Sequence, residues 1–424
     1  MKTRLLYGAI GVTVCAALFS CSKHHDNLGA DDGGKIVYLE TNDFHDNANA
    51  ILAYRQKADG TLAPLPGSPF LTHGAGLANP KQVLGPDDTD DPVVISSDGR
   101  FLFAVNGGSN TVAVFSINPD GSLLSVPGSP FPSGGQTPCS IALHGRFIYI
   151  ANKSFDPLHP ITQLPNYSTF TLDDAGRLEA VPDGKKEVPA GSSPSQVLLS
   201  NDGRFVFATD FLAFMLPSEE PIGTLLSFGI KGDGGLQLAP GAPYVVPAGD
   251  GGALGLATNP RSDNTLYVGF PVGGKFGVYH LDAATGVPTF VTQQNAGPGV
   301  CWIRTNSLGN RLYTLNSGQN SVGIYNVDNP EAPDSISTLK LKDASNNGDF
   351  SLNFSPDGGT LYVVSQNTDT TFAANNNWLH VLKVAPDGTL SEPGNPLQLP
   401  VPNDARPQGV DDSRSRNPAQ GIPR

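Results

Sequence analysis

The amino-acid sequence predicts an all-β fold, a seven-bladed β-propeller whose ring is closed by a C-terminal strand joining the first blade. Three observations support this prediction. The 424 residues include 49 Gly and 37 Pro but only 15% charged residues, which is typical of short strands joined by turns. A unit of four strands with Asp-Gly turns recurs along the chain. The first copy of this unit lacks its opening strand.

The first 34 residues are predicted to precede the folded part. Lys2 and Arg4 come before an apolar run, Leu5 to Phe19, that is too short to span a bilayer comfortably. The run ends in Leu18-Phe19-Ser20-Cys21, which resembles a bacterial lipoprotein signal over residues 1–21. We therefore expect Cys21 to be lipidated and to hold the protein on a membrane surface of the cell envelope, with ordinary secretion as the alternative. Residues 22–34 are polar and Gly-rich, which predicts a flexible tether.

The clearest repeat unit is PVVISSDGRFLFAVNGGSNTVAVFSINPDGSLLSVPGSPF, from Pro92 to Phe131. It contains an apolar strand, an Asp-Gly turn, a second strand, a Gly-rich turn, a third strand, another Asp-Gly turn and a last strand. Asp-Gly between apolar runs indicates a hairpin, because glycine tolerates the positive φ that such a turn needs. Four antiparallel strands in this order make one propeller blade.

Variants of this unit follow to the end of the chain. The ending GSPF occurs at Gly67 and again at Gly128, and GAPY occurs at Gly241. Residues of the seven predicted second strands lie 46 to 65 residues apart, at Ile36, Phe101, Phe147, Phe205, Leu266, Leu312 and Leu361. A four-stranded repeat of roughly 40–50 residues is typical of a propeller. The longer intervals predict loop insertions.

The two ends of the repeat region predict how the ring closes. The first unit begins at Lys35 with KIVYLETN, which corresponds to a second strand. RPQGVDD, from Arg406 to Asp412, corresponds to the opening of another blade. We therefore expect the C-terminus to supply the innermost strand of the first blade and so remove the open sheet edges. The predicted domain is 35–410, followed by a polar tail, 411–424.

Charge and cysteine content exclude some classes of function. The net charge of −13 disfavours nucleic-acid binding, because an acidic surface repels phosphate. Only Cys139 and Cys301 lie in the folded part, at the starts of inner strands, where small buried packing residues are expected. No zinc cluster, phosphate loop, dinucleotide fingerprint or nucleophile elbow is present, so we expect no cofactor and no metal.

The first strand of each propeller blade lines the central channel. The starts of these strands and the turns between second and third strands therefore lie on one face, here named the top face. Long insertions on one face often build a binding site. Catalytic candidates on this face are Arg304, His45, His159 and Asp210. Binding candidates at the starts of inner strands are Ser140, Gln196, Trp302 and Arg406.

Several of these residues also have an ordinary structural interpretation. Arg304 would place a cation in the channel, suited to a carboxylate or phosphate, or would form a salt bridge in the channel wall. Asp210 is an acid–base candidate, although a carboxylate that caps a turn is the more common case. PDDTDDP, from Pro86 to Pro92, could bind calcium weakly, but without the spacing of a calcium loop it is interpreted as a solvated acidic loop.

The repeats resemble a known family. Three stretches carry the resemblance: P-x-S-I-A-x-x-G-R-F-I-Y-I-A-N, D-G-x-L-x-x-x-P-G-S-P-F and C-W-I-x-T-x-x-x-G-x-x-x-Y-T-x-N. They are similar to motifs of the seven-bladed propeller lactonases, which include 6-phosphogluconolactonase-like and carboxymuconate-cyclase-like proteins. The resemblance covers about Lys35 to Val410. It implies channel histidine, glutamate and arginine side chains, with a histidine often following the Pro at the start of an inner strand. Here Pro138 precedes Cys139-Ser140, and Pro194 precedes Ser195-Gln196.

Two functions follow as hypotheses. The resemblance implies an exported lactonase-like protein that hydrolyses or forms a small sugar or carboxylate lactone at the channel mouth. In this hypothesis Arg304 holds a substrate carboxylate, and His45 or His159 moves protons. The alternative is a non-catalytic surface protein that binds a carbohydrate or a protein partner, because Asn- and Gly-rich turns suit hydrogen bonds to sugars. In both cases we expect a monomer.

Overall fold

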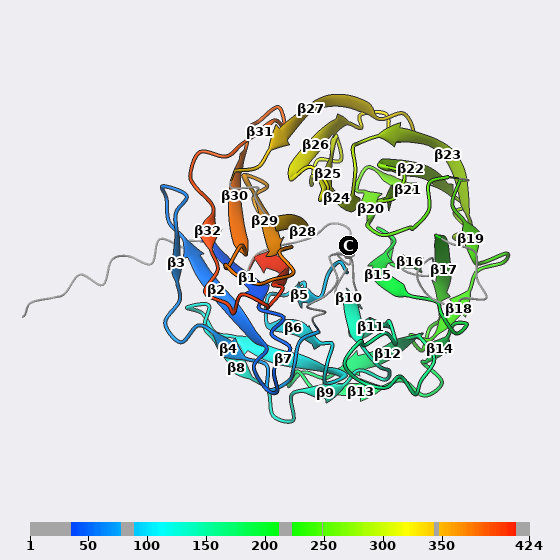
Figure 1. The fold of residues 1–424 in the computed structure, drawn as a ribbon. Coiled ribbons are helices and arrows are strands. Elements are labelled where there is room, and N and C mark those ends of the chain that lie inside the picture. The colour runs from blue at the N-terminus through cyan, green and yellow to red at the C-terminus, as the bar shows by residue number, and fades with distance from the viewer. Residues whose placement is uncertain (1–34, 78–88, 212–222, 248, 343–346, 413–424) are drawn as a thin grey trace, which may run out of the picture. The chain divides into compact units, whose positions relative to one another are not determined.

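The computed structural model describes residues 35–77, 89–211, 223–247, 249–342 and 347–412. These residues form seven antiparallel sheets, arranged as the blades of a ring (Figure 1). The predicted seven-bladed, all-β fold is confirmed. The signal with Cys21, the tether, and Asp87 and Asp88 lie outside the described residues, so their roles stay predictions. No helix among the described residues has the length and apolar character needed to cross a bilayer.

The blades follow one another along the chain. Blade 1 contains β33 (Gln408–Asp412), β1 (Ile36–Glu40), β2 (Ala50–Gln56), β3 (Leu62–Pro64) and β4 (Phe70–Leu71). Blade 2 contains β5 (Val93–Ile95), β6 (Phe101–Asn106), β7 (Thr111–Ile117), β8 (Leu123–Ser125) and β9 (Phe131–Pro132). Blade 3 contains β10 (Pro138–His144), β11 (Phe147–Asn152), β12 (Asn166–Leu172), β13 (Leu178–Ala180) and β14 (Lys186–Glu187). Blade 4 contains β15 (Pro194–Leu199), β16 (Phe205–Asp210), β17 (Thr224–Ile230), β18 (Leu236–Leu238) and β19 (Tyr244–Val245).

The last three blades keep the same order. Blade 5 contains β20 (Leu256–Asn259), β21 (Ser262–Phe270), β22 (Lys275–Leu281) and β23 (Pro288–Asn295). Blade 6 contains β24 (Val300–Thr305), β25 (Arg311–Asn316), β26 (Ser321–Asn326) and β27 (Asp334–Lys340). Blade 7 contains β28 (Asn347–Phe354), β29 (Thr360–Asn367), β30 (Trp378–Val384), β31 (Leu390–Ser391) and β32 (Leu397–Gln398).

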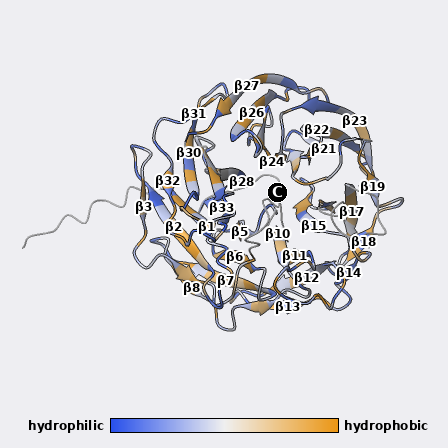
Figure 2. Cartoon of the chain, in the orientation of Figure 1, coloured by the Kyte–Doolittle hydropathy of each residue, from blue (hydrophilic) through white to orange (hydrophobic). Residues whose placement is uncertain are grey.

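The hydrophobic core lies between the blades. Because successive side chains on a strand point to opposite faces, each blade packs on both of its neighbours. In β1, Tyr38 packs toward blade 2, whereas Val37 and Leu39 pack toward blade 7. Seven hydrophobic clusters occupy the seven joints between neighbouring blades. Figure 2 accordingly shows hydrophobic colour along the strands of every blade.

Turn chemistry follows the repeat. Gly99, Gly121 and Gly203, each after an Asp, adopt positive φ. The Asp98 carboxylate accepts a hydrogen bond from Arg100 N at 3.1 Å, which closes its turn. The motifs GSPF and GAPY contain the three cis peptide bonds Ser68-Pro69, Ser129-Pro130 and Ala242-Pro243.

The C-terminal strand closes the ring as predicted. β33 pairs antiparallel with β1, with Leu39 opposite Val410, and in Figure 1 the red β33 lies beside the blue β1. β33 includes Asp411 and Asp412, so the ordered ring extends two residues into the predicted tail. The Asp411 carboxylate accepts hydrogen bonds from Ile95 N at 2.8 Å and Asn353 Nδ2 at 3.2 Å. One side chain of the closing strand therefore contacts the inner strands of blades 2 and 7.

Candidate functional site

A short segment before β5, Thr89–Asp91, contacts the inner strands of several blades. The Thr89 hydroxyl contacts the carbonyl oxygens of Cys139 and Ser195, the latter at 2.9 Å. The Asp91 carbonyl oxygen accepts a hydrogen bond from Ile141 N at 2.9 Å. Asp91 has a left-handed backbone, with φ of 56°, which Asp tolerates better than most residues. This channel segment, Thr89–Asp91, carries two carboxylates to the inner strands.

The two carboxylates meet Arg304 of β24. Arg304 Nη1 donates to Asp90 Oδ2 at 2.5 Å, and Nη2 donates to Asp90 Oδ1 at 2.8 Å, so this pair is bidentate. Nη2 also donates to Asp91 Oδ1 at 2.6 Å. All three side chains are buried. Charge-assisted, bidentate contacts of this kind are short and strong.

Gln196 of β15 completes the group, which we name the channel cluster: Asp90, Asp91, Gln196 and Arg304. Gln196 Nε2 lies 3.1 Å from Asp90 Oδ2 and 3.1 Å from Asp91 Oδ2, and donates to both. Its Oε1 accepts a hydrogen bond from Leu256 N at 2.5 Å, which fixes the orientation of the amide. The cluster contains two carboxylates and one guanidinium, so it carries one excess negative charge when both carboxylates are ionised.

Burial and the neighbouring charges together determine the protonation behaviour of the cluster. Burial raises the pKa of Asp91 to about 7, Arg304 opposes that rise, and Asp90 adds to it. Burial lowers the pKa of Arg304, but Asp90 and Asp91 together raise it above its usual range. The guanidinium therefore stays charged, and Asp91 is the group that exchanges a proton near neutral pH.

The channel cluster corrects one sequence interpretation. PDDTDDP was expected to be a solvated acidic loop, but Asp90 and Asp91 are only 2% and 6% exposed. The physical reason is Arg304, a buried cation more than 200 residues away that compensates the two charges. The sequence signal was an acidic pair directly before a strand that lines the channel. No group of three or more His, Cys, Asp or Glu side chains in the described ranges is arranged to hold a metal ion.

Of the predicted residues, the structure brings Arg304 and Gln196 together. Ser140 is buried, and its Oγ accepts a hydrogen bond from Val197 N at 3.1 Å, so it joins the inner strands of blades 3 and 4. Trp302 is fully buried in the hydrophobic cluster between blades 6 and 7. Arg406 is 1% exposed. Cys139 and Cys301 are buried, as expected for packing residues.

His45 and His159 lie on exposed loops and contact acidic residues of their own loops. His45 Nδ1 lies 2.7 Å from Asp43 Oδ1, and its ring stacks on Phe44. The hydrogen bond to Asp43 raises the pKa of His45, while partial burial lowers it. His159 Nδ1 lies 2.7 Å from Asp156 Oδ2. Within the described residues, neither imidazole contacts the channel cluster, so the structure separates them from Arg304.

Two further carboxylates end second strands on the top face. Asp210 Oδ1 accepts a hydrogen bond from Ser193 N at 2.6 Å, which is the backbone-capping role considered from the sequence. Glu40, which the sequence analysis did not select, is fully buried and accepts from Asn49 Nδ2 at 2.5 Å. Burial raises the pKa of Glu40 to about 8, against the hydrogen bonds from Asn49 and Gln408. By strand register Glu40 corresponds to Val105 of blade 2, one residue before the position that Asn106 occupies there.

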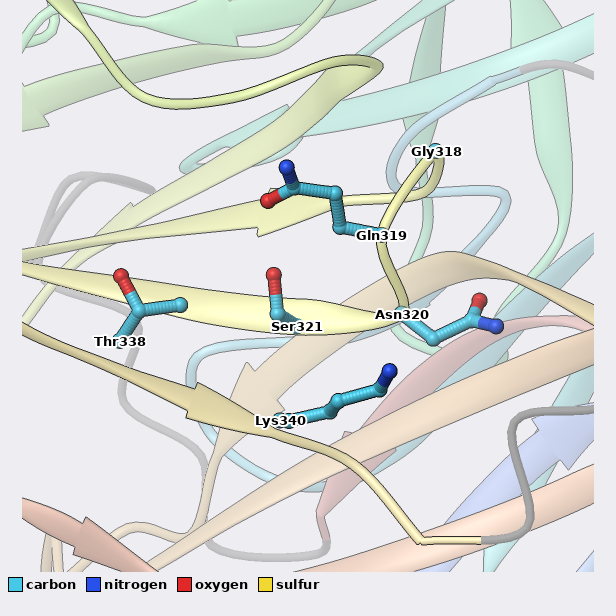
Figure 3. Close-up of a pocket in the computed structure, with 6 residues that line it drawn as sticks. All are labelled: Gly318, Gln319, Asn320, Ser321, Thr338 and Lys340. Atoms are coloured by element: carbon cyan, nitrogen blue, oxygen red, sulfur yellow. The ribbon is translucent and has the colours of Figure 1, made fainter.

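A separate polar pocket of about 520 Å³ lies on blade 6. In Figure 3, the turn before β26 and the start of β26 form one wall, and β27 forms the other. Amide, hydroxyl and ammonium groups dominate the lining, which consists of Gly318, Gln319, Asn320, Ser321, Thr338 and Lys340. The turn belongs to the predicted top face.

Comparison with known proteins supports the predicted resemblance. Residues 85–163 match the family model described as lactonase, 7-bladed β-propeller. This stretch includes the channel segment and the strand-turn-strand of β10 and β11. No curated protein matches the chain. The chain therefore has a seven-bladed propeller fold and is similar to the lactonase family over residues 85–163.

Solved structures share the fold over most of the chain. A Bacteroides fragilis protein provisionally named 6-phosphogluconolactonase has 18% identity and a TM-score of 0.64, covering 91% of this chain and 99% of its own. The periplasmic gluconolactonase of Pseudomonas aeruginosa has 17% identity and a TM-score of 0.66, covering 89% of this chain and 99% of its own. At these identities the likeness concerns the fold alone.

Proposed function

We propose that the protein hydrolyses a small lactone at the channel cluster. The observation that supports this proposal is that Asp90 and Asp91 share one guanidinium in a buried site, where burial raises the pKa of Asp91 to about 7. A general base is most effective when its pKa lies near the working pH. The names of the fold relatives, which include a gluconolactonase, favour a sugar lactone as substrate.

The proposed reaction uses only groups of the cluster and water. Ionised Asp91 accepts a proton from water as the water oxygen bonds to the lactone carbonyl carbon. Arg304, held by Asp90, stabilises the negative charge that develops on the carbonyl oxygen. The bond between this carbon and the ring oxygen then breaks, and Asp91 returns its proton to that oxygen. The product is an open hydroxy acid, which releases a proton to solvent. His45 and His159 have no role in this scheme.

The test is lactone hydrolysis by purified protein over a panel of sugar lactones between pH 5 and 9. We expect kcat/KM to rise with pH through an apparent pKa of about 7, as Asp91 becomes ionised. Asp91→Asn should lower kcat by roughly 10²–10⁴-fold. Asp98→Asn, in an exposed turn, is the matched control and should keep full activity. An Asp91→Asn variant as active as wild type would exclude Asp91 as the base.

The polar pocket of blade 6 favours a second candidate function, carbohydrate binding without catalysis. Its amides and hydroxyls can donate and accept hydrogen bonds to sugar hydroxyls, and Lys340 adds a positive charge suited to a sugar acid. We expect gluconate to bind more tightly than glucose by calorimetry, and Lys340→Ala to remove the difference. Asp91→Asn, far along the sequence, serves as the control and should bind normally. Equal affinities for the two sugars in wild type would contradict a role for Lys340.

A further inference from the structure

Three buried titratable side chains and one hydroxyl form a continuous hydrogen-bonded chain inside blade 7. Ser365 Oγ lies 2.6 Å from Asp349 Oδ1 and 2.9 Å from His380 Nε2. His380 Nδ1 lies 2.8 Å from Glu392 Oε1. Asp349 and Ser365 are fully buried, and the side chains of His380 and Glu392 are 1% and 3% exposed. The proposed lactone chemistry uses none of these groups.

The strand order of the blade places these groups in a row. Asp349 lies on β28 directly opposite Ser365 on β29. His380 lies on the next strand, β30, and Glu392 directly follows β31. The chain of hydrogen bonds therefore crosses the blade from its innermost strand to its outer strand.

The row of hydrogen bonds is complete only when it holds one proton more than ionised Asp349, ionised Glu392 and neutral His380 provide. Ser365 has one hydroxyl hydrogen but lies between two groups that can accept it. In one arrangement His380 carries both ring protons, donates to Glu392 and Ser365, and Ser365 donates to ionised Asp349. In the other, Asp349 is protonated and donates to Ser365, and Ser365 donates to neutral His380. The two arrangements contain the same atoms and differ by one proton passed through the Ser365 hydroxyl.

Loss of that proton is unfavourable in this environment. It leaves two ionised, buried carboxylates, Asp349 and Glu392. The single Ser365 hydroxyl hydrogen can then bond to Asp349 or to His380, but not to both. Burial raises the pKa of Asp349 to about 6, Ser365 and His380 lower it, and Glu392 raises it. Lys342 is a further charged residue beside these hydrogen-bonded groups, and its backbone N–H donates to Glu392 Oε2 at 2.8 Å. Its ammonium donates elsewhere, to Gly394 O at 2.7 Å.

The residues at both ends of this row of hydrogen bonds contact blade 6. At one end, the Ser317 hydroxyl donates to the Asp349 carbonyl oxygen at 2.7 Å. At the other end, Glu392 accepts from Lys342 N. Ser317 directly precedes the pocket wall Gly318–Ser321, and Lys342 follows the wall that carries Thr338 and Lys340. Blade 7 thus contacts the segments that flank both walls of the polar pocket, through the backbone carbonyl of Asp349 and the carboxylate of Glu392.

We propose that Asp349, Ser365, His380 and Glu392 form a proton relay that holds one shared proton, and that loss of this proton as the pH rises loosens the joint between blades 6 and 7. Ser365 is a positioning residue in this relay, not a nucleophile, because it is fully buried. The loosening is expected at high pH and not at low pH, because proton binding and folding are coupled. A group whose pKa is raised by folding stabilises the fold at low pH, and its contribution is lost as the pH rises through that pKa.

The two tryptophans of the protein provide the readout. Trp302 packs in the cluster between blades 6 and 7, and Trp378 lies opposite Ser365 on the neighbouring strand. We expect the intrinsic fluorescence of the wild-type protein to change in a sigmoidal step centred near pH 6, the pKa of Asp349. Ser365→Ala should shift the midpoint by about one pH unit or more, because its two neighbours no longer share a proton. Asp349→Asn should abolish the step.

A matched control is Ser227→Ala in blade 4. Ser227 is also a buried strand hydroxyl; it donates to Gly286 O at 2.8 Å, and among the residues that the structure describes its Oγ has no titratable hydrogen-bond partner. This variant should lose some stability but keep the wild-type fluorescence midpoint. The relay would be refuted by a wild-type protein without a step, or by the same midpoint in wild type, Ser365→Ala and Asp349→Asn. If Ser365→Ala fails to fold, the comparison of Asp349→Asn with wild type tests the relay, and an unchanged midpoint in Asp349→Asn would refute it. No lactone or sugar is added, so the result is independent of the proposed functions.

Discussion

Replacing Arg304 with alanine should lower the free energy of unfolding by about 3–5 kcal/mol at neutral pH. The substitution leaves Asp90 and Asp91 buried within reach of Gln196 but without a cation. Two uncompensated carboxylates in a poorly solvated site are far more costly than an exposed pair. The measurement is urea unfolding followed by circular dichroism.

The pH dependence of this loss tests its cause. Lowering the pH favours protonated Asp91, whose pKa is about 7 even with Arg304 opposing the rise, so the difference between Arg304→Ala and wild type should shrink as the pH falls below 7. Arg204→Ala is the matched control, because its guanidinium also lies 2.6 Å from an aspartate, Asp202, but on the exposed surface. Its loss should stay below about 1 kcal/mol. Similar losses in both variants at pH 7 would contradict a buried, charge-dependent role for Arg304.

Removing the closing strand should abolish the cooperative fold. A chain that ends at Pro407 lacks β33, so β1 loses its inner neighbour, and Val410 is missing from the cluster between blades 7 and 1. It also lacks the Asp411 contacts to Ile95 and Asn353. An unpaired inner strand in a broken ring exposes backbone groups and apolar surface together.

The control for this deletion is a chain that ends at Asp412, which keeps every described strand. Thermal unfolding by near-ultraviolet circular dichroism should show a sharp transition for the chain ending at Asp412 and none for the chain ending at Pro407. Size-exclusion chromatography should show aggregation only for the shorter chain. A sharp transition at the same temperature in both chains would show that β33 does not close the ring energetically.

The fold was accessible from the sequence because its signals are local and repeated. Asp98-Gly99 and Asp120-Gly121 mark turns, and the apolar runs between them mark strands whose two faces are both buried. The ring closure could be predicted because the first unit starts at a second strand and the last one offers RPQGVDD. Each of these signals needs only neighbouring residues or comparison of one repeat with another.

The candidate site could be predicted from the sequence only in part. Arg304 and Gln196 were selected from their repeat positions, and the structure places both on the same two carboxylates. The burial of Asp90 and Asp91 could not be predicted, because it depends on a cation supplied by a distant blade. The proton relay could not be predicted for the same reason. Its residues, Asp349, Ser365, His380 and Glu392, come together only when the strands of blade 7 are paired in register.

The position of β33 has a consequence for how the protein is made. Because synthesis proceeds from the N-terminus, the inner edge of β1 is produced among the first residues of the ring, and its partner is produced among the last. Six of the seven joints between blades can form as the chain emerges. The joint that buries Val37 and Leu39 against blade 7 must wait for nearly the whole polypeptide. During that interval blade 1 presents an unpaired strand, which exposes it to aggregation or to binding by a chaperone.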